Sequence, residues 1–222
     1  MNKNIALIKQ KIEKTDTIFF DLDGVLIDTE KLYFRFWKEA CLFYGFVLSD
    51  EDALTLRSRD MEDAKTFFDK IFCGQLDYYV AREKRIELMN KYFEAHPIEL
   101  KLGSLEILKK FKENNKNLYI VTANKVDKAL KIMNSLHINE YFESVISAKN
   151  VKRGKPFPDV YLKACEIVNK KPSDVVVFED SPNGLKASHS AGCFTIMVED
   201  LTPYAEDMYY VDGAIVSLKE LL

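Results

Sequence analysis

The fold of this chain is decided by the stretch Thr17-Ile18-Phe19-Phe20-Asp21-Leu22-Asp23-Gly24-Val25-Leu26-Ile27-Asp28-Thr29-Glu30. It begins with the apolar, β-type composition of a short buried strand. That strand would end in Asp21 and Asp23, which lie two positions apart and therefore point to one side of an extended chain. Burying carboxylates is costly unless they are paired or bind a cation. The stretch therefore predicts a strand that delivers acidic side chains to a site, with Gly24 allowing a sharp turn.

Two other interpretations account for an Asp-x-Asp pair. Such pairs are common in solvated turns, where aspartate and glycine are favoured residues. A calcium loop of the EF-hand type would need acids at loop positions 1, 3 and 5, glycine at 6 and glutamate at 12. Val25 stands where the third acid should be, and Gly24 comes at the fourth position. The calcium loop is therefore disfavoured, whereas the solvated turn stays open on this motif alone.

Length and composition describe a chain that can fold around a substantial core. Its 222 residues are enough for one large domain or for a domain with an inserted module, and 47% of them are hydrophobic. The net charge of −3 and the lack of a basic stripe argue against nucleic acid as a partner. No apolar run approaches the ~20 residues that span a bilayer, so no membrane partner is expected. A monomer is the default expectation.

The N-terminus and the cysteines point to a reducing compartment. Residues 1–10 lack the apolar segment of roughly 7–15 residues that characterises a signal peptide. The cysteines are scattered without paired spacing, which disfavours a disulfide framework and a structural zinc site. They are Cys41, Cys73, Cys165 and Cys193. We therefore expect free thiols and a cytoplasmic location.

Two kinds of pattern divide the chain. Ile5, Ile8 and Ile12 recur at helical spacing and predict a short helix docked on the surface. From 31 to 97 the pattern is helical throughout, with aromatic stripes that indicate core packing. From 103 onward strands and helices alternate, as in parallel βαβ units. We therefore predict an α/β fold, in which residues 1–30 and 98–222 form a doubly wound, Rossmann-like parallel sheet and residues 31–97 form an inserted all-helical domain.

The strands expected after the first cover 118–121, 145–146, 175–178, 195–198 and 214–216, and a last helix is expected to begin at residue 218. Several of these strands end in polar side chains. One strand leads to Thr122 and another to Glu179 and Asp180, while Lys155 follows the strand at 145–146. Ligands of doubly wound sheets bind beyond the carboxyl ends of the strands. Together with Asp21, these residues therefore indicate one site.

The chemistry of these side chains favours a reaction on phosphate. Clustered carboxylates repel unless a cation lies among them, and a site with few protein oxygens suits Mg²⁺, which keeps waters and accepts substrate phosphate. Lys155 and the Thr122 hydroxyl are suited to holding phosphate oxygens. A carboxylate nucleophile in such surroundings fits phosphoryl transfer through an aspartyl phosphate. Plainer interpretations remain for single residues: Lys155 as a surface lysine, Thr122 as a strand end, and Glu179-Asp180 as a helix cap.

Four motifs follow one another along the chain. They are Asp21-Leu22-Asp23-Gly24-Val25-Leu26-Ile27-Asp28-Thr29-Glu30, Val121-Thr122-Ala123-Asn124, Gly154-Lys155-Pro156-Phe157-Pro158-Asp159 and Phe178-Glu179-Asp180-Ser181-Pro182-Asn183-Gly184. Together they resemble the motifs of the haloacid dehalogenase-like hydrolase superfamily, in that family's order. The subgroup of β-phosphoglucomutase and related small-molecule phosphatases is the most similar. The resemblance covers the chain after about residue 14.

The resemblance implies a role for each of these residues. Asp21 would be the nucleophile, and Asp23 the general acid and then the general base. The transferring phosphoryl group would be bound by Thr122, Ala123 and Asn124. Lys155 would bridge that group and the nucleophile.

The cofactor implied by the resemblance is Mg²⁺. Its ligands would be Asp21, the backbone carbonyl of Asp23, and Asp180, with Glu179 in a supporting or water-mediated role. Residues 31–97 would be the helical cap that the family inserts between its first two motifs. These roles imply a phosphatase that hydrolyses a small phosphorylated metabolite, such as a sugar phosphate.

Three alternative functions share parts of this pattern. A phosphomutase uses the same chemistry but passes the phosphoryl group to a sugar hydroxyl. A haloacid dehalogenase does not use an acid at Asp23 or a metal, so the presence of Asp23, Glu179 and Asp180 argues against it. A non-catalytic binding module would be expected to have lost a motif residue, and all of them are present.

Two departures from β-phosphoglucomutase favour hydrolysis over mutase activity. That enzyme has a histidine twelve residues after its nucleophile, where this chain has Tyr33. A phenol, with a pKa of about 10, does not replace an imidazole near neutral pH. Its cap arginine, which holds the second phosphate, aligns with Met61, although Arg57 and Arg59 lie nearby. The second departure is therefore the weaker of the two.

Overall fold

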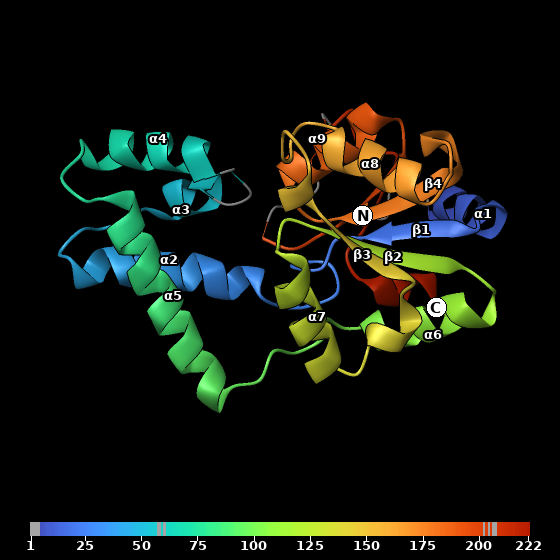
Figure 1. Cartoon of the computed structure of the whole chain (residues 1–222), viewed down its shortest axis with the longest axis horizontal. Helices are drawn as coiled ribbons and strands as arrows, with labels where there is room; N and C mark the ends of the chain where they lie inside the picture. The colour runs from blue at the N-terminus through green and yellow to red at the C-terminus, as the bar shows by residue number, and fades with distance from the viewer. Residues whose placement is uncertain (1–4, 57–58, 60, 202, 204, 206–207) are drawn as a thin grey trace. The chain divides into compact units, whose positions relative to one another are not determined.

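The computed structural model describes residues 5–56, 59, 61–201, 203, 205 and 208–222. The chain divides into two compact units, Met1–Asp28 with Glu99–Leu222, and Thr29–Ile98. We call them the core unit and the helical unit. Figure 1 shows the strands gathered in the core unit, whereas the described part of the helical unit consists of helices and their connections.

A parallel sheet, six-stranded among the described residues, forms the centre of the core unit. Its order is β3 (Ser144–Ser147), β2 (Asn117–Thr122), β1 (Thr17–Phe20), β4 (Val175–Glu179), β5 (Phe194–Val198) and β6 (Gly213–Ile215). The middle strand β1 places Phe19 opposite both Tyr119 of β2 and Val177 of β4. The chain winds outward from β1 to β3 and then returns to β4, so the predicted doubly wound parallel sheet is confirmed.

Helices cover both faces of this sheet. Figure 1 shows α6 (Ser104–Glu113) and α7 (Val126–Ser135) on one face, and α8 (Asp159–Ile167) and α9 (Pro182–Ala191) on the other. Neighbouring residues of β1 point to opposite faces. Phe19 therefore packs in a buried cluster with Tyr161 of α8, whereas Phe20 stacks on Phe178 at a centroid distance of 4.8 Å and lies near Phe111 of α6. This two-sided burial holds β1 rigidly in the middle of the sheet.

The ends of the chain agree with the predictions, with one difference. The helix predicted around Ile8 and Ile12 is α1 (Ile5–Lys14), and both isoleucines are buried. The last helix, which was expected to begin at residue 218, takes the 3₁₀ form, η4 (Leu218–Leu221). Ser217 and Glu220 form a capping box around this single turn, and 3₁₀ geometry is common in such short pieces. Shorter 3₁₀ turns occur at η1 (Asn139–Tyr141), η2 (Ala148–Asn150) and η3 (Pro172–Asp174).

The helical unit contains α2 (Glu30–Phe43), α3 (Asp50–Leu56), α4 (Met61–Phe72) and α5 (Tyr78–Ala95). Its aromatic stripes meet in a core, as predicted. Trp37 of α2 stacks on Tyr78 of α5 at 5.6 Å, and Phe68 of α4 packs edge-on against Tyr78. Ser49 accepts a hydrogen bond from the Asp52 amide and thereby starts α3. Among the described helices, none has the length and apolar character needed to cross a membrane.

Candidate active site

Asp21 directly follows the central strand. Its amide donates to the carbonyl of Phe178 at 2.9 Å, so the pairing of β1 with β4 continues as far as Asp21. The residue as a whole is buried, with 8% of its surface exposed. The four buried residues of β1 are followed directly by Asp21, so this strand places the Asp21 carboxylate at the carboxyl edge of the sheet.

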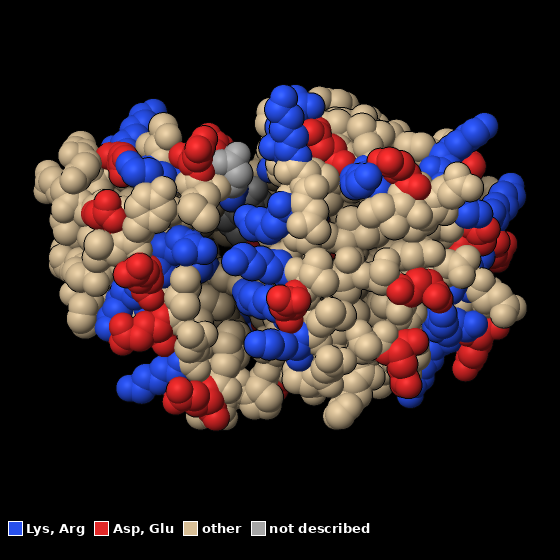
Figure 2. Space-filling view, viewed as in Figure 1, with Lys and Arg blue, Asp and Glu red and all other residues tan. Residues whose placement is uncertain are grey.

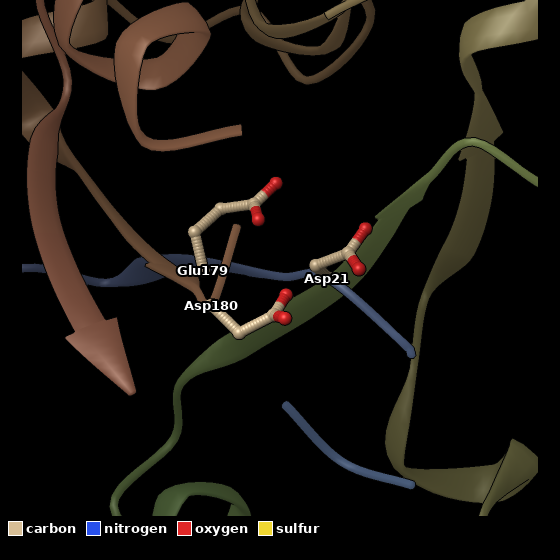
Figure 3. Close-up of side chains that lie close together, drawn as sticks. All are labelled: Asp21, Glu179 and Asp180. Carbon is tan, nitrogen blue, oxygen red and sulfur yellow. The ribbon is translucent and has the colours of Figure 1, made fainter. Parts of the chain in front are cut away.

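Three buried carboxylates meet at this edge. Asp21 comes from the end of β1, and Glu179 and Asp180 come from the end of the neighbouring β4 (Figure 3). One carboxylate oxygen of each lies within 4.8 Å of those of the other two. Burial raises the pKa of Asp21 well above the usual range, and the charges of Glu179 and Asp180 raise it further, against the opposing effect of Lys155. The all-oxygen donor set could hold a hard metal ion, which would compensate this crowding of negative charge.

Lys155 supplies positive charge to the same cluster. Its ammonium donates to Asp21 Oδ1 at 2.8 Å, to Glu179 Oε1, and to the backbone carbonyl of Val121 at 3.3 Å. Burial opposes a charged lysine, but the carboxylates of Asp21 and Glu179 outweigh it and raise the pKa of Lys155 above its usual range. Lys155 is therefore an ammonium held against the candidate nucleophile, rather than a surface lysine.

The residues after β2 approach Asp23. Thr122 is buried and accepts a hydrogen bond on Oγ1 from the Asn124 amide at 3.1 Å. The side-chain amide of Asn124 donates to Asp23 Oδ2 at 2.5 Å, a contact that the sequence did not predict. Ala123 is exposed between them. Asp23 is not one of the three carboxylates in the cluster formed by Asp21, Glu179 and Asp180.

Two glycines make room for the carboxylates. Gly24 has a φ of 76°, and a Cβ atom there would overlap the carboxylate of Asp180. Gly184, in the first turn of α9, has an ordinary φ, but a Cβ atom there would overlap the carboxylate of Glu179. Both glycines belong to the motifs quoted above, and close approach to an acid explains them physically.

Basic side chains gather over α7 on the visible face of the core unit (Figure 2). The exposed lysines of α7 and of its N-cap position are Lys125, Lys128 and Lys131. Lys125 directly follows Asn124, so this basic surface begins beside the candidate site. Such a surface attracts anions.

The comparison with known proteins agrees with this geometry. The family model described as haloacid dehalogenase-like hydrolase matches residues 18–198. The chain belongs to the haloacid dehalogenase-like hydrolase family. A curated member, the phosphorylated carbohydrates phosphatase of Thermotoga maritima, is 32% identical over 180 residues, which cover 80% of this chain and 82% of that protein. The beta-phosphoglucomutase of Bacillus subtilis is 29% identical over 189 residues, 82% of each chain.

The fold of this hydrolase recurs in solved structures. A crystal structure of a HAD hydrolase, family IA, variant 3, from Entamoeba histolytica superposes with a TM-score of 0.77 at 24% identity, covering 93% of this chain and 95% of that one. The predictions of an enzyme of this hydrolase family, with a β-phosphoglucomutase-like and phosphatase-like character, are confirmed. The roles of the single residues stay predictions.

Sequence reasoning missed one side chain of this hydrolase site. Tyr161 of α8 is fully buried, and its hydroxyl lies 2.5 Å from Glu179 Oε1. In the sequence it is one more aromatic residue on a helix, six positions after Lys155, and nothing in the helical pattern distinguishes it from ordinary core. Its position two residues after Asp159, the last residue of the third motif, is the signal that could have drawn attention to it.

Proposed function

We propose that this protein hydrolyses the phosphomonoester of a small metabolite, such as a sugar phosphate, through an aspartyl phosphate formed on Asp21. The observation that carries the proposal is the buried contact of 2.8 Å between Asp21 and Lys155, beside Glu179 and Asp180. A carboxylate that is buried, adjacent to an ammonium and located at a strand end is suited to nucleophilic attack on phosphate. The relative named for phosphorylated carbohydrates supports the substrate class.

In the first step, a carboxylate oxygen of Asp21 attacks phosphorus, and the bond from phosphorus to the substrate oxygen breaks. Asp23 donates its proton to that leaving oxygen. In the second step, water attacks the phosphorus of the aspartyl phosphate while Asp23 accepts a proton, and Asp21 is released with inorganic phosphate. Asn124 orients Asp23 through their hydrogen bond. Lys155 and the Thr122 hydroxyl are proposed to hold the transferring phosphoryl oxygens.

Asp21, Glu179 and Asp180 are proposed to hold Mg²⁺, with the backbone carbonyl of Asp23 as a further ligand. The carboxylate-only donor set of the cluster supports this choice, because Mg²⁺ prefers oxygen ligands. When bound, the ion would neutralise negative charge that develops on the phosphoryl oxygens. We further propose that the helical unit, inserted in the chain between β1 and α6, is the cap predicted from the sequence. The monomeric state and cytoplasmic location stay predictions.

Mutase activity is the second candidate, because beta-phosphoglucomutase of Bacillus subtilis is among the relatives. The helical unit supports hydrolysis instead. Tyr33 stands at the sequence position of the mutase histidine. The centroid of its ring lies 4.8 Å from the guanidinium of Arg85, so this position holds a phenol in a cation–π contact. Arg59 donates to Asp63 at 2.8 Å and stacks on Phe67. It is therefore already engaged within the unit, while Arg57 lies outside the described residues.

Two assays test the proposed reaction. Turnover of p-nitrophenyl phosphate is measured with Mg²⁺, with EDTA, and with Ca²⁺; we expect activity with Mg²⁺, loss with EDTA, and poor activity with Ca²⁺, whose bonds are longer. Full activity in metal-free buffer would contradict the metal site. In the second assay, β-glucose 1-phosphate is supplied with a trace of β-glucose 1,6-bisphosphate. Release of inorganic phosphate supports the hydrolase, and rapid formation of glucose 6-phosphate with little free phosphate identifies a mutase.

A further inference from the structure

Tyr161 reaches the acidic cluster from inside the core. Its hydroxyl lies 2.5 Å from Glu179 Oε1, and neither side chain is exposed to solvent. The same oxygen accepts a hydrogen bond from the Lys155 ammonium. Ser181 donates to the other oxygen, Oε2, over a longer distance of 3.4 Å. Two strong donors therefore converge on Oε1, whereas Oε2 receives a weak one.

The hydroxyl of Tyr161 acts as the donor in this contact. Its partner Oε1 is a carboxylate oxygen, which accepts hydrogen bonds, so the O–H of the phenol is the group that donates. A donor aimed at a carboxylate forms a charge-assisted hydrogen bond, which is stronger than one between neutral groups. The ring is held by its neighbours in the buried cluster, and the Lys155 ammonium lies 5.3 Å from its centroid. Tyr161 is thus a rigid donor.

Glu179 needs such a contact to present one oxygen to a cation. The last torsion angle of a glutamate side chain has only a weak intrinsic preference, so its carboxylate plane is set by external contacts. Lys155 sets it incompletely, because the ammonium also donates to Asp21 and to the backbone of Val121. Tyr161, which belongs to the buried cluster of the core, supplies a second donor to the same oxygen.

We propose that Tyr161 is a positioning residue of the metal site, which holds Glu179 by its Oε1 and thereby fixes the orientation of this carboxylate beside the cation. This inference rests on the proposed function, because it assumes that the cluster binds Mg²⁺. Tyr161 contacts neither substrate nor metal and acts through Glu179. Its removal should therefore weaken metal binding while leaving the chemical step intact once the metal is bound.

The test is metal binding by the variant Tyr161→Phe, which removes the hydroxyl and keeps the ring. Mn²⁺, a paramagnetic ion with similar oxygen preference, is titrated into the protein and the free ion is measured by electron paramagnetic resonance. We expect the Kd to rise about tenfold, the lower limit for losing a hydrogen bond to a charged group. The matched control is Tyr119→Phe, because Tyr119 packs against the same buried cluster but lies within β2, three residues before Thr122. Its Kd should stay at the wild-type value.

A second measurement separates positioning from general damage. The Mg²⁺ concentration needed for half-maximal turnover should rise in Tyr161→Phe, while kcat at saturating Mg²⁺ should stay within about twofold of wild type. In a Glu179→Ala background, the same substitution should change the Kd for Mn²⁺ no further, since the group through which Tyr161 acts is gone.

The outcomes are distinct. An unchanged Kd for Mn²⁺ in Tyr161→Phe, with a wild type that binds the ion, overturns the role of Tyr161 and leaves the proposed metal site standing. A wild type that does not bind Mn²⁺ overturns both. Equal weakening by Tyr161→Phe in the presence and absence of Glu179 would show that the phenol acts by another route.

Discussion

Lys155 donates to Asp21 Oδ1 at 2.8 Å and thereby joins two residues that lie 134 positions apart in the sequence. Both side chains are nearly buried, with 9% and 12% of their surfaces exposed. Breaking such a pair leaves a buried charge without its partner, which costs about 3–5 kcal/mol. The pair therefore ties the loop before α8 to the end of β1, and it holds an ammonium where a phosphoryl group on Asp21 would carry negative charge.

The space beside Glu179 is expected to tolerate no additional atom. Gly184→Ala would place a Cβ atom against the Glu179 carboxylate, although alanine otherwise favours a helix over glycine by about 1 kcal/mol. We expect a net loss of about 1–3 kcal/mol in the free energy of unfolding, as for other overpacked positions, together with a loss of phosphatase activity. Urea denaturation and p-nitrophenyl phosphate turnover measure the two effects.

Gly154→Ala is the matched control for this substitution. No atom lies within 4 Å of the Cβ that it would add, and the residue adjoins Lys155 in the same motif set. Its stability should change by less than about 0.5 kcal/mol, as for surface substitutions without special contacts. If Gly184→Ala were as stable and as active as Gly154→Ala, the close contact at Glu179 would be refuted.

Asp23→Asn should slow the cleavage of phosphate esters according to their leaving groups. A general acid typically contributes ~10²–10⁴ in rate. An alkyl phosphate, whose leaving oxygen needs a proton, should approach this loss, whereas p-nitrophenyl phosphate should lose much less. The comparison needs kcat/KM for both esters in the wild type and the variant. Equal losses for the two esters would exclude Asp23 as the proton donor.

Metal binding is expected to stabilise the fold more at neutral than at acidic pH. Burial, with the charges of Glu179 and Asp180, raises the pKa of folded Asp21 despite Lys155. A raised folded pKa means that the stability contributed by Asp21 is complete below the unfolded value of about 4 and is lost as the pH rises through the folded value. At pH values above the folded pKa, a bound cation would neutralise the Asp21 carboxylate in place of the lost proton.

Thermal denaturation with and without Mg²⁺ measures this effect. The increase in Tm caused by Mg²⁺ should be larger at pH 7.5 than at pH 5, because protons compete with the ion for Asp21 at the lower pH. Asp180→Asn should reduce the increase at both values. An increase that does not depend on pH would show that the ion binds elsewhere.

The sheet could be predicted from the sequence because its signals are local. β1, β2 and β4 are short apolar runs that end in polar residues, and such runs are recognisable without tertiary information. Their convergence at one edge followed from the rule for doubly wound sheets. The 3₁₀ form of Leu218–Leu221 could not be predicted in the same way, since the apolar pattern of one turn does not distinguish it from an α-helix.

The contacts within the candidate site depended on tertiary structure. The distance between Lys155 and Asp21, and the hydrogen bond from Asn124 to Asp23, arise from loops whose paths no residue pattern encodes. Tyr161 was hidden for a different reason, because a buried phenol and a buried phenylalanine produce the same helical pattern. Only the position of its hydroxyl against Glu179 separates the two.

The central claim is that Asp21 becomes phosphorylated, and trapping of the phosphorylated enzyme tests it most directly. Enzyme and substrate are mixed for milliseconds, quenched, and treated with borohydride, which reduces an acyl phosphate of aspartate to homoserine. Peptide mass spectrometry should find homoserine at position 21 in the wild type, and none in Asp21→Asn, which should stay folded while losing more than about 10³-fold in activity. Rapid turnover of the wild type with unmodified Asp21, or with the phosphoryl group trapped on another residue, would contradict the account.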